Sequence, residues 1–162
     1  MFLMFPAALA FAGAMDLFTM TIPNRISLGL VIAFVVALPF SGLDAAALAS
    51  HVGAGVLMLA LGFLMFNRGW LGGGDAKLLA SASLWLGLDL LLTYVAVVTV
   101  AGALLVLALL FFRTICLPPQ LSLQPWAARL HRQGGDVPYG LAIAAGALWI
   151  YPQTIWFATW AV

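Results

Sequence analysis

Six apolar segments make up most of this chain and leave only short stretches between them. A helix needs about 20 apolar residues to cross the roughly 30 Å hydrocarbon core of a bilayer, so six crossings would use most of the 162 residues. The sequence therefore predicts an all-α, polytopic membrane protein, a single domain over residues 1–162. The six expected spans are residues 2–15, 26–40, 45–66, 76–88, 90–112 and 137–160.

The composition excludes several other classes of protein. Hydrophobic residues make up 65% of the chain and charged residues 7%, with a formal net charge of +1. This balance offers no basic surface for nucleic acid, so nucleic-acid binding is not expected. The single cysteine, Cys116, cannot form an internal disulfide or a thiolate zinc site. We expect neither a metal nor a cofactor, because the acidic residues have no nearby His or Cys cluster.

The basic residues decide how many spans to expect. Segment 76–88 is short and could fuse with segment 90–112 into one interrupted run. With six separate spans, however, all six Lys and Arg residues fall on one side, as the positive-inside rule prefers. Both termini are then expected on the non-cytoplasmic side, and loop 113–136 in the cytoplasm. The six basic residues are Arg25, Arg68, Lys77, Arg113, Arg129 and Arg132.

Two further segments need an interpretation. The N-terminal apolar run lacks the positive charges that open a signal peptide, so we expect it to remain as the first span. In loop 113–136, Trp126 and Leu130 lie four residues apart beside two arginines. This spacing suits a short helix at the membrane surface, with a plain connecting loop as the alternative.

Few polar residues remain as candidates for chemistry. Asp44 and Asp89 are expected in turns on the outer side, as turn or cap residues. His51 has no second imidazole nearby in the sequence and is a poor candidate for a metal ligand.

Asp16 and Asp75 are different, because both are expected at the cytoplasmic face on separate helices. Two carboxylates at matching depth can approach each other and share a proton, as in an aspartyl protease. Glycines 72–74 would leave room beside Asp75 for a peptide backbone. The structural alternatives are a helix N-cap for Asp75 and an interfacial turn for Asp16. Two other functions compete with this one. The chain could be a small proton-linked transporter that uses both acids as relay groups, or a noncatalytic assembly scaffold.

Three motifs in this order resemble those of type IV prepilin peptidases, which are aspartic peptidases of the GxGD class. Residues 16–25 (DLFTMTIPNR) are similar to their first aspartate element, which ends in I-P-N. Residues 72–78 (GGGDAKL) resemble the G-x-G-D-x-K-L element, and residues 137–146 (VPYGLAIAAG) the P-Y-G sequence that opens their last span.

This resemblance implies an endopeptidase that removes the short basic leader of prepilins at the cytoplasmic face of the inner membrane. Asp16 and Asp75 correspond to its catalytic pair, and its partners would be prepilins and membrane lipids. The lone Cys116 and the short chain resemble the peptidase-only branch associated with Flp-type, tight-adherence pili, without methyltransferase activity. No oligomeric state is indicated. The other motif residues are Ile22, Pro23, Asn24, Gly72, Gly74, Lys77, Pro138, Tyr139 and Gly140.

The motif residues also have a physical interpretation. Lys77 lies two residues after Asp75, so on a helix it points away from that carboxylate, toward lipid phosphate or the loop. Pro23 and Asn24 suit the turn before the second span. Tyr139 is expected at the membrane interface, where the last span begins.

Overall fold

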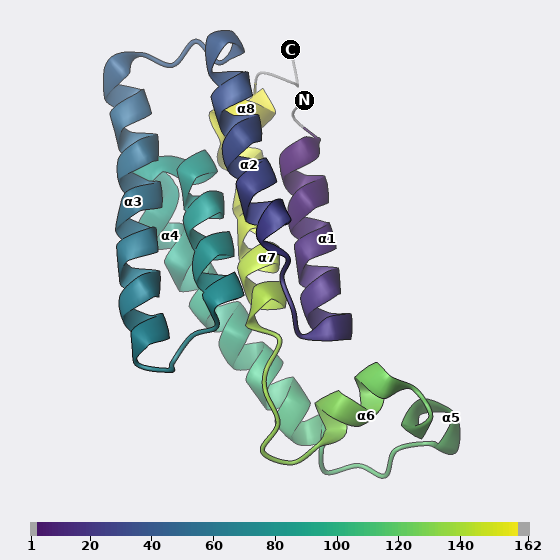
Figure 1. Ribbon diagram of the computed structural model, residues 1–162. Coiled ribbons are helices and arrows are strands. Elements are labelled where there is room, and N and C mark those ends of the chain that lie inside the picture. Colours follow the sequence, from purple (N-terminus) through teal and green to yellow (C-terminus); the bar gives the residue numbers. More distant parts are fainter. Residues whose placement is uncertain (1–2, 159–162) are drawn as a thin grey trace.

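A computed structural model describes residues 3–158, and within them every regular element is helical (Figure 1). The predicted all-α class is therefore confirmed. The described elements are α1 (Met4–Thr19), α2 (Asn24–Ala37), η1 (Leu38–Phe40), α3 (Ala45–Asn67), α4 (Gly73–Phe112), α5 (Pro119–Ser122), α6 (Pro125–His131), α7 (Tyr139–Ile150), η2 (Tyr151–Gln153) and α8 (Ile155–Ala158).

Two of these helices, α3 and α4, are long and apolar enough to cross a membrane, whereas α1 and α2 are shorter apolar helices. The outward faces of the helices carry large apolar side chains. Val56 is 61% exposed, Leu92 82% and Phe111 70%. Exposed apolar surface on this scale is unusual for a soluble monomer and indicates that the helices face lipid.

Helix α4 reverses its direction at Gly87, where φ is 76° and ψ is 173°. Only glycine adopts this backbone conformation without strain. Figure 1 shows α4 running up beside α3 and then returning behind it. Asp75 from the first arm (residues 73–86) and Val106 from the second (88–112) consequently line one cavity. The expected break between segments 76–88 and 90–112 is present, one or two residues earlier than predicted.

An aromatic cluster closes one end of the helix bundle. The rings of Trp85 and Trp156 have centroids 4.9 Å apart, and both pack on Phe34. Each indole N–H also has a buried partner: Trp85 donates to the carbonyl of Leu30 at 3.0 Å, and Trp156 to that of Trp85 at 2.7 Å. With its polar atoms satisfied, this cluster packs α2, α4 and α8 tightly together.

The expected last span, residues 137–160, is not a single continuous helix. Helix α7 ends at Ile150, and the chain continues through the 3-10 turn η2 into α8. Pro152 explains the interruption, because proline has no N–H to donate and its ring clashes with the preceding helical turn. The expected positions 2, 159 and 160 lie outside the described residues.

The helix order brings the basic residues to one end of the bundle. Arg25 lies in the first turn of α2, Arg68 just after α3 and Arg113 just after α4. The predicted short helix at Trp126 and Leu130 is α6, which lies at that same end. Asp44 and Asp89 lie at the other end, since they follow η1 and Gly87.

Candidate active site

Asp16 and Asp75 come together at the basic end of the bundle, although 59 positions separate them in the sequence. Asp16 lies in the last full turn of α1, which ends at Thr19, four residues beyond the expected end of the first span at residue 15. Asp75 lies in the first turn of α4. Their carboxylates are close enough for the two charges to interact, and both line one cavity. Two acids sharing one enclosed space can hold a proton between them.

Asp16 is fixed by the start of α7. Its side chain is only 6% exposed, and its Oδ2 accepts a hydrogen bond of 2.7 Å from the amide of Gly140. This amide lies in the first turn of α7, where helical N–H groups have no partner within the helix. Glycine is required there, because a Cβ at position 140 would lie 2.9 Å from Oδ2 and 3.1 Å from Cγ of Asp16.

Asp75 is held less completely. Its Oδ2 lies against Gly72, where an added Cβ would be only 2.8 Å away. Its Oδ1 is buried and has no hydrogen-bond partner among the described residues. Since buried polar atoms are nearly always satisfied, an unpartnered carboxylate oxygen beside a second carboxylate is suited to carry a proton or to hold a reacting water.

Ile22 separates the two glycines that flank the acids. A Cβ on Gly74 would lie 3.1 Å from Cβ of Ile22, and a Cβ on Gly140 would meet its Cδ1. The segment between α1 and α2 thus inserts one apolar side chain between the start of α4 and the start of α7. Ile22 fixes the spacing of these two helix starts and covers one side of the acidic pair.

The cavity around the acids has a volume of about 540 Å³. Its lining combines the ends of α1 and α3, both arms of α4 and the approach to α7. The lining residues are Asp16, Met20, Gly69, Trp70, Leu71, Gly72, Asp75, Val106, Asp136, Val137 and Tyr139. A space of this size is large enough for a short extended peptide segment.

The loop after α4 contacts the end of α1, the helix that carries Asp16. Arg129 on α6 donates hydrogen bonds to the carbonyls of Phe18 at 2.8 Å and Thr19 at 3.1 Å, which are free at the end of α1. Trp126 packs edge-on against Phe18 with ring centroids 5.5 Å apart. The short helix α6 is therefore attached to the end of α1, two to three residues after Asp16.

Arg113 holds the other end of this loop. Its guanidinium donates to the carbonyls of Leu130, Gly135 and Asp136 at 2.9, 3.0 and 3.1 Å. Three bonds from one planar group fix the backbone just before α7. The arginine thereby positions the segment that contributes Asp136 to the cavity wall.

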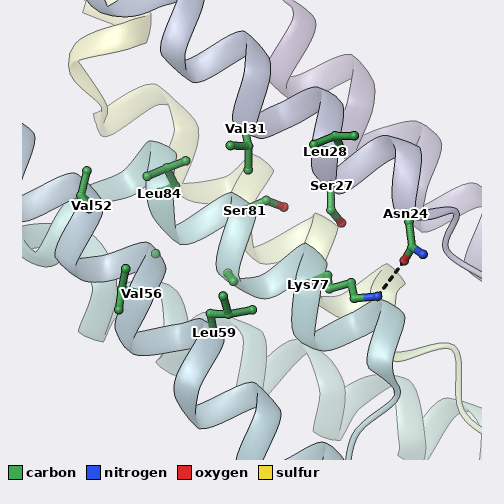
Figure 2. Close-up of a pocket in the computed structure, with 12 residues that line it drawn as sticks. Asn24, Ser27, Leu28, Val31, Val52, Val56, Leu59, Lys77, Ser81 and Leu84 are labelled. Carbon is green, nitrogen blue, oxygen red and sulfur yellow. Dashed lines mark hydrogen bonds between the residues drawn. The ribbon is translucent and has the colours of Figure 1, made fainter.

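Lys77 and Asn24 lie outside this cavity. The ammonium of Lys77 donates to Oδ1 of Asn24 at 3.0 Å, as Figure 2 shows. Neither residue lines the cavity that contains Asp75. Pro23 directly precedes α2 with φ −61°. Pro138 is fully buried before α7. Tyr139 packs its hydroxyl end where Gly102 has no side chain.

The remaining polar candidates lie away from the acids. Asp44 caps α3, its Oδ1 accepting from the amide of Ala47 at 2.8 Å. Asp89 is exposed near the turn at Gly87. His51 is buried, with Nδ1 2.8 Å from the carbonyl of Leu84. In the described part of the chain, no group of three or more His, Cys or acidic residues could hold a metal ion.

Sequence reasoning missed several residues of the cavity wall. Asp136 was assigned only to a loop, and Met20, Trp70 and Val106 were not assigned to any site. Met20 has a left-handed φ of 54°, the only positive φ among the described non-glycine residues. Trp70 carries the guanidinium of Arg68 over its ring at 5.3 Å. No local pattern marks these positions, because tertiary contacts alone bring them to the cavity.

Comparison with known families gives a direct match. The sequence profile of the type IV leader peptidase family matches residues 3–113, which include both aspartates and the glycines before Asp75. Neither the curated proteins nor the solved structures contain a significant match to the chain.

Proposed function

The chain belongs to the type IV leader peptidase family, and we propose that it is a prepilin leader peptidase with Asp16 and Asp75 as its catalytic pair. Membership of this family implies aspartic peptidase activity. The observation that carries the assignment is the meeting of these two carboxylates in one cavity, from helices that lie far apart in sequence.

The geometry supports a general acid and base mechanism. The pair holds one proton, and Oδ1 of Asp75 is the oxygen that lacks a partner in the described structure. The ionised carboxylate takes a proton from water, whose oxygen attacks the peptide carbonyl carbon. The protonated carboxyl polarises the carbonyl oxygen and then protonates the departing amine as the C–N bond breaks. The Gly140 amide keeps Asp16 in place during these steps.

The cavity also suits a basic leader peptide. Glycine at position 72 removes a side chain next to Asp75, so a substrate backbone can come close. Asp136 is a third acidic residue lining the cavity, and its side chain forms no ion pair among the described residues. A positively charged leader gains from this concentration of acidic groups.

The proposed location is the inner membrane, with six crossings and the acids facing the cytoplasm. Two observations support this topology. Helix α4 reverses at Gly87, and the basic residues lie at the end of the bundle that contains Asp16 and Asp75. The proposal includes Flp-type prepilins as substrates and cleavage without methylation of the new pilin N-terminus.

A cleavage assay with purified protein in detergent and a purified Flp-type prepilin tests this function. We expect Asp16→Asn and Asp75→Asn each to lower the cleavage rate at least about 10³-fold, because each removes one of the two proton carriers. Asp44→Asn and Asp89→Asn are matched controls at the far end of the bundle and should cleave normally.

Mass spectrometry of the product identifies the cleaved bond and shows whether a methyl group is added when a methyl donor is present. Full activity in either Asp16→Asn or Asp75→Asn would overturn the aspartyl mechanism. Intact prepilin after incubation with the wild-type protein would instead favour a proton-relay or scaffold role.

A further inference from the structure

A second cavity lies on the opposite side of the first arm of α4. Its volume is about 500 Å³, and it runs between α2 and α3 with α4 as its floor, as Figure 2 shows. Both α2 and α3 pack mainly on α4 rather than on each other, which leaves this groove open along the side of the bundle. Leu28 and Val56 on its two edges are 59% and 61% exposed.

The groove is amphipathic along its length. Asn24, Ser27 and Lys77 lie toward one end, and Val31, Val52 and Leu84 toward the other (Figure 2). The polar end is the end of the bundle that carries the basic residues. Positions 77 to 84 span two helical turns, so the groove extends about 10 Å along the helices.

The polar end has hydrogen-bonding groups to spare. An ammonium group has three N–H donors, and Asn24 accepts only one of those on Lys77. Ser27 is only 7% exposed, yet its hydroxyl has no partner among the described residues and points into the groove in Figure 2. No acidic residue lines the groove, so the charge of Lys77 is not neutralised there.

Helix stability does not explain this lysine. Lys77 lies in the second turn of α4, near the positive end of the helix dipole, where a cation is unfavourable. A ligand with a negative charge beside an apolar chain would satisfy Lys77, Ser27 and the apolar walls together. We propose that the groove is a binding site for an anionic phospholipid, whose phosphate lies at Lys77 and Ser27 and whose acyl chain lies between α2 and α3.

The dimensions favour a lipid chain over a peptide helix. A helix about 10 Å across would occupy roughly 800 Å³ over two turns, more than the groove provides. An extended peptide would need partners for its N–H and C=O groups along its whole length. Beyond the polar end, however, the lining offers only the hydroxyl of Ser81, which already donates to the carbonyl of Leu78. In the proposed orientation that end faces the cytoplasmic leaflet, which holds anionic lipids.

Native mass spectrometry of the full chain in detergent tests the site, with equal amounts of phosphatidylglycerol and phosphatidylcholine carrying the same acyl chains. The wild-type protein should retain one phosphatidylglycerol in preference to phosphatidylcholine. Lys77→Gln should lower this preference about fivefold, the loss expected for one basic residue near an anionic lipid surface. Arg68→Gln, at the same end of the bundle but outside the groove, should keep the preference.

A second pair of variants tests the apolar part. Val56→Trp places a large ring in the groove and should abolish retention of either lipid, whereas Leu57→Trp, at the same depth but outside the lining, should retain phosphatidylglycerol. Equal retention of both lipids by the wild type, or wild-type preference in Lys77→Gln, would overturn the proposal. Displacement of the lipid by prepilin peptide, or a dimer that Val56→Trp dissociates, would assign the groove to another occupant. Since lipid retention is read without cleavage, the result is independent of the proposed peptidase activity.

Discussion

The amide of Gly140 donates a 2.7 Å hydrogen bond to Oδ2 of Asp16, joining the first turn of α7 to the last full turn of α1. The bond needs close approach of backbone and carboxylate, which any side chain at position 140 would obstruct. The glycine of the P-Y-G motif therefore has a direct physical connection to one of the two acids.

We expect Gly140→Ala to lower prepilin cleavage about 10²-fold, the effect of displacing a reacting group by about 1 Å. The new Cβ would lie 2.9 Å from Oδ2 of Asp16, so either α7 or the carboxylate must move. The matched control is Gly29→Ala, because nothing lies within 4 Å of a Cβ at that position. Equal rates in the two variants would show that this contact does not position Asp16.

Arg129→Ala should lower the cleavage rate about tenfold, because it removes the two hydrogen bonds that attach α6 to the end of α1. Hydrogen exchange over residues 125–131 should become faster in the same variant. Arg132→Ala is the control, since the side chain of Arg132 is exposed and has no hydrogen bond in the described part of the chain. If Arg129→Ala leaves both the rate and the exchange unchanged, α6 is not held by this contact.

Gly87→Ala should destabilise the protein by about 1 to 3 kcal/mol, the cost of holding a residue with a side chain in this glycine-only conformation. Position 87 has φ 76°, and a Cβ there would also meet the ring of His51 at 3.4 Å. Thermal unfolding in detergent measures the change. Gly53→Ala lies in a regular helix at the same end, with only an ordinary contact to Leu88, and should unfold close to the wild-type temperature.

Reporter fusions test the orientation in the membrane. Fusions after Arg68 and Arg129 should report from the cytoplasm, and a fusion after Asp44 from the other side, because basic residues are retained inside. The C-terminal residue Val162, outside the described residues, is also expected on the non-cytoplasmic side. A cytoplasmic signal at Asp44 would overturn both the six-span topology and the leaflet assigned to the lipid groove.

The sequence by itself determined the helical class and the two candidate acids. Each apolar segment of bilayer length is a local feature of the sequence, and the side preferred by the basic residues follows from counting them. Neither observation requires knowledge of the fold. Asp16 and Asp75 were identifiable because ionisable residues are rare in membrane-spanning segments, where their free-energy cost is usually offset by a functional role. The break near Gly87 was also visible, since glycine and a charged residue interrupt the apolar run there.

Only the tertiary structure decided which residues surround the acids. Asp136 reaches the cavity because Arg113 fixes the loop before α7, and Val106 reaches it because α4 reverses at Gly87. Neither arrangement leaves a sequence pattern at position 136 or 106. The interruption of the last helix after Ile150 was missed because overall hydrophobicity outweighed the single residue Pro152. The lipid groove likewise depends on α2 and α3 packing on α4 rather than on each other, a long-range relationship that the order of residues along one helix does not encode.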